Sequence, residues 1–255
     1  MKASGIEVAH LTDIGRKRKH NEDAFGFFSL SEDEVLAIVA DGMGGHASGE
    51  VASRMAVEII QEVYAKERME QDVLEALRSA FEVANFTILQ KSLEQEDLNG
   101  MGTTATALVI KGDQTFVGHM GDSRAYLFRD ATVHQLTRDH SMVNRMVEQG
   151  LLSKEEAQHH PQRNVIYKTL GVNRDADLDL VGPLSVQGDD IFLLCSDGLT
   201  SLVSDEELLK TMKKESPEKA CEKLIQMANK RGGHDNITIQ ILKVKPPADR
   251  AGLHG

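Results

Sequence analysis

Between residues 103 and 137 the chain alternates short β-rich segments with tight turns. The segments are Thr104–Ile110, Thr115–Met120 and Arg124–Phe128, separated by the linkers Lys111–Gln114 and Gly121–Ser123. Linkers of this length suit β-hairpins, whereas parallel strands need a crossover of about a dozen residues or more. We therefore expect antiparallel strands in this part of the chain.

Helical and apolar segments complete the pattern. Apolar residues recur every three to four positions in Ala47–Tyr64, Gln71–Gln90 and Pro217–Asn229, which predicts amphipathic helices. Further strands are predicted at Val35–Ala40, Ile191–Cys195 and Ile237–Val244. Because two long helices lie together between groups of strands, we expect an α+β fold. Its architecture is a four-layer α-β-β-α sandwich of two antiparallel sheets flanked by helices.

The chain of 255 residues is long enough for one large domain. We expect a single domain over residues 1–245, followed by a polar tail, residues 246–255, without fixed structure. Residues 138–171 interrupt the strands with two short helical stretches, which predicts a small insertion, here called the flap, over one edge of the core. Helix starts are indicated by Ser153 with Glu156, Ser204 with Glu207, and Ser216 before Pro217.

The charge of the chain limits its partners. The formal net charge is −11, and such a surface repels nucleic acids and anionic lipids. The two cysteines, Cys195 and Cys221, form no paired motif, which is typical of a reducing compartment. No signal peptide is evident, and no apolar run approaches the ~18 residues of a membrane span. We expect a cytoplasmic monomer with no nucleic-acid or membrane partner.

Aspartates stand at the ends of the predicted strands. They are Asp41, Asp122, Asp197 and Asp235. One such aspartate is more often a turn residue or helix cap, but four of them converge if their strands are neighbours. Converging carboxylates repel each other, and a divalent cation relieves the repulsion. Mg²⁺ and Mn²⁺ both prefer oxygen ligands, so we expect a site for Mn²⁺ or Mg²⁺.

Such a site has a direct use in phosphate chemistry. Two divalent ions ~3.5–4 Å apart share and acidify a water, and the resulting hydroxide can attack phosphorus. No serine or cysteine nucleophile is needed, and Cys195 lies inside an apolar run. Arg18 lies just before Asn21-Glu22-Asp23, and an arginine fork can bind two phosphate oxygens at once.

These residues belong to an ordered series of motifs that resembles the metal-dependent protein phosphatases, also called the protein phosphatase 2C family. The motifs are Arg18–Asp23, Asp41–His46 with Gly49-Glu50, Gly102–Thr104, Gly121–Arg124, Ser196–Leu199 and Asp235–Thr238. The resemblance covers residues 5 to 245. It implies the same sandwich of two antiparallel sheets, with residues 138–171 as a flap that influences substrate access.

The resemblance also implies a role for each acid of the metal site. Asp41 is expected to bridge two ions, one of which also binds the carbonyl oxygen of Gly42. Asp197 and Asp235 are expected to bind the other ion. Asp122, together with Asp197, resembles the site of a third ion in bacterial members. A glycine at position 42 would let its own carbonyl approach the metal.

Four further residues complete the implied site. Glu22 and Asp23 are expected to act through metal-bound waters, and Arg18 to hold the substrate phosphate. Some family members carry a histidine directly after the Asp-Gly pair, where this chain has Met43. His46 follows three positions later, and it could either protonate the leaving alkoxide or cap the next helix. A metal-bound water is the alternative proton donor.

We therefore predict a protein serine/threonine phosphatase, a phosphoric monoester hydrolase. It is expected to hydrolyse phosphoserine and phosphothreonine by attack of a metal-bridging water or hydroxide. Phosphoproteins are the expected substrates, and a bacterial Ser/Thr kinase the expected opposing enzyme. One alternative is a non-catalytic, partner-binding member of the same fold, which should have lost metal acids. A metal-dependent phosphodiesterase or nuclease is disfavoured by the net charge and the absence of tryptophan.

Overall fold

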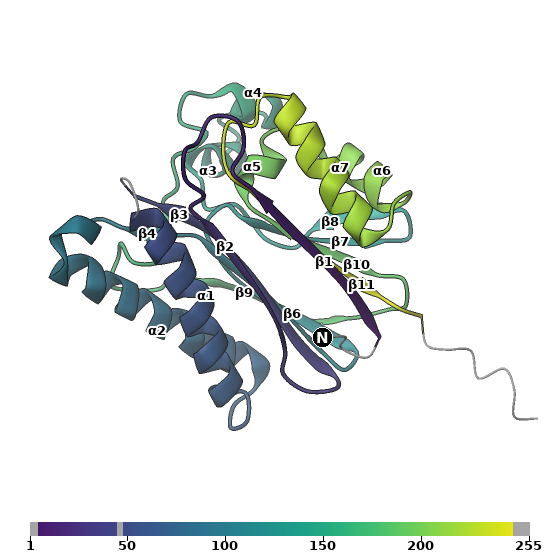
Figure 1. The fold of residues 1–255 in the computed structure, drawn as a ribbon, viewed down its shortest axis with the longest axis horizontal. Coiled ribbons are helices and arrows are strands. Elements are labelled where there is room, and N and C mark those ends of the chain that lie inside the picture. The colour runs from purple at the N-terminus through teal and green to yellow at the C-terminus, as the bar shows by residue number, and fades with distance from the viewer. Residues whose placement is uncertain (1–4, 45–47, 247–255) are drawn as a thin grey trace, which may run out of the picture.

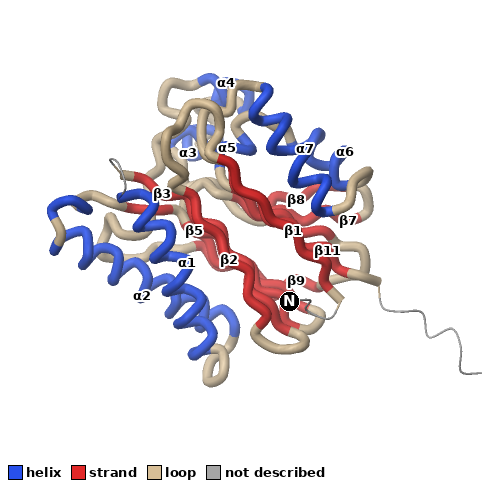
Figure 2. The backbone as a smooth tube through the Cα atoms, in the orientation of Figure 1, coloured by secondary structure: helices blue, strands red, loops and turns tan. Residues whose placement is uncertain are grey.

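Two antiparallel β-sheets lie face to face, with helices on the outer side of each sheet (Figure 1). The structure is a computed structural model that describes residues 5–44 and 48–246. Helices α1 and α2 cover one sheet, and helices α6 and α7 cover the other (Figure 2). The predicted α+β sandwich with four layers is confirmed.

The first sheet has five strands in the order β1-β11-β10-β7-β8. Their bounds are Ile6–Asp13 (β1), Ile237–Val244 (β11), Ile191–Cys195 (β10), Arg124–Arg129 (β7) and Thr132–Gln135 (β8). All neighbouring strands are antiparallel. The helices on this side are α5 (Asp197–Thr200), α6 (Asp205–Met212) and α7 (Pro217–Lys230).

The second sheet has six strands in the order β2-β3-β5-β6-β9, with β4 paired to the end of β3. Their bounds are Asp23–Ser29 (β2), Glu34–Met43 (β3), Gly102–Thr103 (β4), Ala105–Lys111 (β5), Gln114–Met120 (β6) and Asp179–Ser185 (β9). The long helices α1 (Ser48–Glu67) and α2 (Val73–Glu94) lie on this sheet, and a short 3-10 turn, η1 (Glu96–Leu98), follows α2.

The interior strands agree with the prediction, whereas the strands at the sheet edges were not predicted. Strands β1, β8, β2 and β9 are the outer strands of the two sheets, and most of their residues are at least partly exposed. An edge strand packs less of its surface than an interior strand, so it has no continuous apolar run. Strand β9 also contains Pro183, a residue that argues against a central strand.

One predicted neighbour relation is wrong. Strands β5 and β6 form the expected hairpin, but β6 and β7 belong to different sheets. The linker between them, Gly121-Asp122-Ser123, therefore crosses from one sheet to the other. This crossing places Asp122 between the two layers, at the end of the sandwich.

Three apolar clusters hold the layers together. One lies between the sheets and includes Val39, Phe192 and Leu242. The second joins α1 and α2 to their sheet, and the third joins α6 and α7 to theirs. The predicted helix starts are confirmed: capping boxes form at Ser153 and Ser204, and Ser216 caps α7 with proline at its start.

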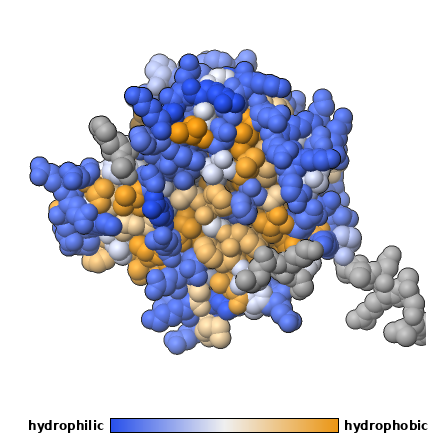
Figure 3. All heavy atoms as spheres, viewed as in Figure 1, coloured by the Kyte–Doolittle hydropathy of each residue, from blue (hydrophilic) through white to orange (hydrophobic). Residues whose placement is uncertain are grey.

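Apolar side chains also reach the surface where the two sheets meet along β1 and β2. Figure 3 shows hydrophobic atoms over the middle of this face, with mostly hydrophilic atoms around them. Partly buried Val8, Phe25 and Phe27 contribute to the cluster between the sheets. The sandwich is thus open along two edge strands rather than closed as a barrel.

The flap contains two short helices, as predicted, α3 (Met142–Glu148) and α4 (Lys154–His159). An isolated bridge between Thr103 and Leu170 joins it to the core, and a second bridge, between Ser141 and Ile166, holds the two ends of the flap together. Within residues 5–44 and 48–246, no helix has the length and apolar character needed to cross a bilayer. Most of the predicted tail, residues 247–255, lies outside the described residues.

Candidate metal and phosphate site

The predicted acids gather at one end of the sandwich. Asp41 lies in the last part of β3, directly opposite Asp23, the first residue of β2. Asp197 follows β10 as the first residue of α5. Asp235 comes two residues before β11, and Asp122 lies in the link that crosses between the sheets. Strand ends from both sheets thus bring five aspartates together.

The aspartates affect one another's ionisation. Burial raises the pKa of Asp41 well above its usual range, and the charges of Asp23, Asp197, Asp122 and Asp235 raise it further. Burial also raises the pKa of Asp23 to about 7 and that of Asp197 to about 6. Asp41 and Asp197 are close enough for their carboxyl groups to share a hydrogen bond. Their negative charges are therefore costly without a compensating cation.

Three buried carboxylate oxygens have no hydrogen-bond partner among the described residues. They are Oδ1 of Asp23, Oδ1 of Asp122 and Oδ1 of Asp197. A buried acceptor without a donor is unfavourable, and a divalent cation would supply the missing partner. The residues therefore fit a Mn²⁺ or Mg²⁺ site.

The protein side chains alone do not form a complete coordination shell in the described residues. In the described part of the chain, no group of three or more His, Cys, Asp and Glu side chains has the arrangement of a complete metal site. Mg²⁺ commonly keeps several waters and takes only one or two carboxylates from the protein. A loose set of oxygen donors is consistent with that kind of binding.

Gly42 lies against the start of helix α1. Its backbone N–H donates to the carbonyl oxygen of Glu22 at 3.0 Å. A Cβ at position 42 would overlap the carbonyl oxygen of Gly49 and come within 2.6 Å of that of Glu22. The glycine is thus required for close backbone packing, which the sequence did not indicate. A metal-binding role for its carbonyl stays a prediction.

Two threonines fix the backbone of Asp41. The Asp41 N–H donates to the hydroxyl of Thr104, and the Thr103 hydroxyl donates to the Asp41 carbonyl, both at 2.9 Å. The Thr104 hydroxyl also lies 2.7 Å from that of Ser123. The Gly-Thr-Thr motif therefore connects the strand of Asp41 to the link that carries Asp122.

Asn236 holds the loop between β1 and β2 in place. Its buried amide nitrogen donates to the carbonyls of Ile14 and His20, both at 3.0 Å. Its amide oxygen accepts the N–H of Glu22 at 2.8 Å. Arg18 lies within this loop, so Asn236 determines where Arg18 and Glu22 stand relative to Asp235.

Arg18 reaches one of the predicted metal ligands. Its guanidinium forms an ion pair with Asp235 at 2.7 Å and lies 4.0 Å from the Glu22 carboxylate. The Arg18 side chain is 47% exposed, so it is also accessible to a phosphate. Glu22 itself is largely buried, and this burial raises its pKa.

Comparisons with known proteins show the family of the chain. The sequence model of the family described as protein phosphatase 2C matches residues 14–237. The chain is 40% identical over 239 residues to the serine/threonine phosphatase stp of Listeria monocytogenes serovar 1/2a, covering 91% of this chain and 93% of the relative. The chain belongs to the protein phosphatase 2C family.

Solved structures of bacterial serine/threonine phosphatases share the fold. That of the S. agalactiae serine/threonine phosphatase matches with a TM-score of 0.86 at 36% identity, covering 94% of this chain and 100% of the other. The structure of the catalytic domain of the serine/threonine phosphatase PstP in complex with two manganese ions matches with a TM-score of 0.82 at 33% identity. The match covers 94% of this chain and 99% of the other. The protein phosphatase 2C family consists of metal-dependent phosphoprotein phosphatases. The predicted enzyme class is therefore confirmed.

Several residues of this protein phosphatase 2C chain act on the site without having been predicted. The Ser196 hydroxyl donates to Oδ2 of Asp23 at 2.8 Å. Arg124 forms two-point contacts with Asp139, at 2.9 Å to Oδ1 and 2.6 Å to Oδ2. The positive charge of Arg124 lowers the pKa of Asp122 and so opposes the effect of burial. Ser196 and Arg124 lie inside the motifs Ser196–Leu199 and Gly121–Arg124, and this position was their only signal in the sequence.

Two other predictions concern histidine and cysteine. His46, the candidate general acid, lies outside the described residues, so its role stays a prediction. Cys195 and Cys221 are both buried, and burial raises the pKa of each thiol to about 12. Both cysteines are therefore protonated and unreactive at neutral pH, which agrees with a mechanism without a cysteine nucleophile.

The Gly198→Ala substitution is expected to damage the site through packing alone. A Cβ at position 198 would overlap the carbonyl oxygen of Asn236 and lie 3.4 Å from Cβ of Asp235. Overpacking of this kind costs about 3 kcal/mol, and it should push Asp197 away from Asp235. Urea unfolding with and without Mn²⁺ would measure both effects.

A matched control is Gly112→Ala. Gly112 has a left-handed backbone (φ 59°), but a Cβ there meets nothing within 4 Å. The Gly112→Ala variant should lower the free energy of unfolding by only about 1–2 kcal/mol and leave Mn²⁺ binding unchanged. Equal losses of stability and of Mn²⁺ binding in the two variants would contradict the packing argument.

Proposed function

We propose that this phosphatase removes phosphate from phosphoserine and phosphothreonine in proteins, using two Mn²⁺ or Mg²⁺ ions and a third at Asp122. The observation that carries the proposal is the set of three partnerless, buried carboxylate oxygens beside an exposed arginine. The acids supply a place for cations, and the arginine supplies a partner for phosphate. A non-catalytic member of the fold has no need for this combination.

The carboxylates would hold the ions as the family resemblance implies. Asp41 would be shared between two ions, and Asp197 and Asp235 would complete one of them. The carbonyl of Gly42 would serve the other. When bound, the ions would neutralise the substrate phosphate and activate water as a nucleophile. Because the acids lie at strand ends that are fixed by threonine and serine hydroxyls, they would need little reorganisation to bind the ions.

The remaining residues position the substrate. Arg18 would bind non-bridging phosphate oxygens with its guanidinium fork. Asn236 keeps the Arg18 loop at the rim of the acid cluster through its three hydrogen bonds. Glu22 and Asp23 would act through metal-bound waters. Such a water would donate to the unpartnered Oδ1 of Asp23, whose Oδ2 accepts the Ser196 hydroxyl.

We propose phosphoprotein substrates that include a Ser/Thr kinase and its targets, a monomeric state and a cytoplasmic location. Residues 1–245 would form one phosphatase domain with the flap at 138–171. The named relatives are serine/threonine phosphatases, which supports the substrate class.

Hydrolysis of p-nitrophenyl phosphate tests the function directly. We expect activity that requires Mn²⁺ or Mg²⁺ and is lost with EDTA, together with release of phosphate from phosphoserine and phosphothreonine peptides. Bis-p-nitrophenyl phosphate, a diester, should be a poor substrate. Diester hydrolysis as fast as monoester hydrolysis would favour the nuclease-like alternative, and no turnover by folded, metal-loaded protein would favour a binding module.

Arg18→Ala is expected to separate phosphate binding from metal binding. Loss of the fork should raise KM for p-nitrophenyl phosphate about tenfold or more, since each bond to a charged group contributes about 1.5–3 kcal/mol. The same change frees Asp235 from its ion pair, so less Mn²⁺ should be needed for half-maximal activity. Arg18→Lys keeps the charge without the fork, and its KM should lie between those of the wild type and Arg18→Ala. A rise in the Mn²⁺ requirement that equals the rise in KM would contradict this role.

A further inference from the structure

His140 joins the flap to the turn that carries Asp122. It is fully buried. Its backbone N–H donates to the carbonyl of Gly121 at 2.7 Å, and the N–H of Gly121 donates to Nδ1 of the His140 ring at 3.0 Å. Both backbone polar groups of Gly121 are thus bound to one residue of the flap, immediately before Asp122.

The two ends of the flap meet at the same histidine. The N–H of Tyr167 donates to the carbonyl of His140 at 2.9 Å. The next residue, Ser141, forms a β-bridge with Ile166 and caps helix α3. A displacement of either flap end therefore acts on the His140 backbone, and through it on Gly121.

Gly121 has little freedom to absorb such a displacement. Its φ is 118°, and a Cβ there would lie 2.5 Å from the side chain of Thr104. The Thr104 hydroxyl in turn contacts Ser123 and the N–H of Asp41. The turn is therefore held on one side by Thr104 and on the other by His140.

The His140 ring has one tautomer that suits these contacts. Because Nδ1 accepts the Gly121 N–H, the ring proton belongs on Nε2. This atom faces Oδ2 of Asp179 at 3.2 Å, although the geometry is not that of a hydrogen bond. The ring lies between those of His119 and Tyr167, with centroid distances of 4.8 and 5.8 Å. Burial lowers the pKa of His140, which favours the neutral ring.

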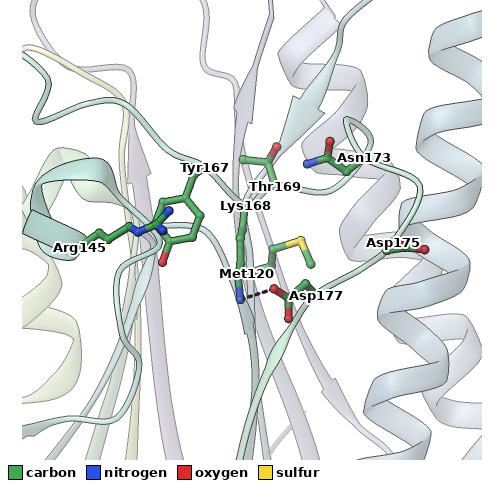
Figure 4. Close-up of a pocket in the computed structure, with 8 residues that line it drawn as sticks. All are labelled: Met120, Arg145, Tyr167, Lys168, Thr169, Asn173, Asp175 and Asp177. Atoms are coloured by element: carbon green, nitrogen blue, oxygen red, sulfur yellow. Dashed lines mark ion pairs between the residues drawn. The ribbon is translucent and has the colours of Figure 1, made fainter. Parts of the chain in front are cut away.

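Tyr167, whose ring lies beside that of His140, also lines a cavity next to the flap. The cavity, of about 310 Å³, is also lined by Arg145 and Lys168 (Figure 4). The guanidinium of Arg145, from helix α3, lies 6.0 Å from the centre of the Tyr167 ring. Lys168 is paired with Asp177 at 2.8 Å. The cavity wall and the His140 contact therefore share one aromatic side chain.

We propose that His140 is a positioning residue that fixes the Gly121–Asp122 turn and makes the placement of the Asp122 carboxylate depend on the position of the flap. The inference rests on the proposed metal-binding role of Asp122. It adds a residue that touches neither substrate nor metal, and it gives the flap a physical connection to the third of the expected ion sites.

Hydrogen exchange of the wild-type protein tests the connection without any substitution. If the two ends of the flap and the Gly121–Asp122 turn open as one unit, the amides of Gly121, His140 and Tyr167 should have protection factors that agree within about threefold. This should hold in EDTA and with Mn²⁺. A Tyr167 amide that exchanges at least about tenfold faster than that of Gly121 would mean that the flap opens without the turn, and would overturn the proposal.

Two conservative variants test the role of the ring. Asn can place an amide oxygen near the position of Nδ1 and so still accept the Gly121 N–H. Gln places its amide near Nε2 and leaves that N–H without a partner. Calorimetric titration with Mn²⁺ should show the site that Asp122→Asn removes about tenfold weaker in His140→Gln, and within about twofold of wild type in His140→Asn. Equal weakening in both variants, or in neither, would overturn the proposal.

Two control variants separate the effect of His140 on Asp122 from other effects of the substitution. Asp122→Asn should itself abolish one Mn²⁺ site, and adding His140→Gln should then change nothing further. Asp179→Asn removes the acid at Nε2 and should leave Mn²⁺ binding unchanged. If Asp122→Asn retains every Mn²⁺ site, the assignment of Asp122 fails, whereas common amide protection would still support the connection. Should His140→Gln fail to fold, the exchange experiment alone decides.

Discussion

The Asp41→Asn variant is expected to lose almost all phosphatase activity while its metal-free form becomes more stable than the metal-free wild type. Asp41 stands at the centre of the acid cluster, opposite Asp23 and within hydrogen-bonding reach of Asp197. Loss of the proposed shared metal ligand should remove several kcal/mol of charge stabilisation. This corresponds to at least about a thousandfold lower kcat/KM.

The gain in stability has a separate cause. The pKa of Asp41 is raised by burial and by four neighbouring carboxylates, so its ionised form is unfavourable in the folded protein at neutral pH. Asn removes that charge with little change in shape. In EDTA at pH 7.5 the variant should gain roughly 1–2 kcal/mol, or about 2–8 °C in Tm. Such a trade-off is typical of residues kept for function rather than for stability.

The matched control is Asp113→Asn in the exposed turn between β5 and β6. It makes the same chemical change far from the cluster and should alter neither activity nor Tm. Thermal unfolding in EDTA and p-nitrophenyl phosphate kinetics with saturating Mn²⁺ measure the two effects. Near-normal turnover of Asp41→Asn would refute the metal assignment, and a lower metal-free Tm would refute the electrostatic argument.

The acid cluster could be predicted because its signal is local in the sequence. Asp41, Asp197 and Asp235 each stand within two residues of a strong interior strand. The ends of interior strands can be recognised from apolar runs, and an aspartate placed there stands out. The direction of pairing followed from linker length. The sequence could therefore indicate both the sandwich and the place where its acids converge.

The contacts that hold the cluster could not be predicted in this way. The Ser196–Asp23 bond joins residues 173 positions apart, and the Glu22–Asn236 bond joins residues 214 apart. Such pairs depend on which sheet each strand enters, and the crossing of the chain between β6 and β7 was itself missed. The edge strands were missed as well because their exposed faces dilute the apolar pattern. Serine and asparagine are also common in turns, so their type carries little information.

Divalent ions should stabilise the protein much more at pH 7.5 than at pH 5. The folded-state pKa values of Asp23, about 7, and Asp197, about 6, are raised above the ~3.9 of an unfolded aspartate. Groups with raised pKa values favour the folded state while they are protonated. That contribution is complete below about pH 4, where the unfolded carboxyl groups are protonated as well, and it is lost as the pH rises from there through about 6 to 7. Metal-free protein should therefore lose stability over this range.

Bound ions reverse that loss, because they require the deprotonated carboxylates. At an ion concentration of 100 times Kd, the gain is about 2.7 kcal/mol, or roughly 5–11 °C in Tm for a chain of this size. The gain should shrink to about 2 °C or less at pH 5, where protons compete for the same oxygens.

The measurement is Tm in EDTA and in Mn²⁺ or Mg²⁺, compared at each pH. Groups outside the cluster contribute equally with and without ions, so they cancel in the difference. One such group is His119, whose pKa burial lowers to about 4. Asp41→Asn should flatten the dependence of the difference on pH, and Asp113→Asn should not. An ion-induced shift that is the same at pH 5 and pH 7.5 would mean that the ions bind elsewhere. A larger shift at pH 7.5 that Asp41→Asn abolishes would locate the ions at the end of β3.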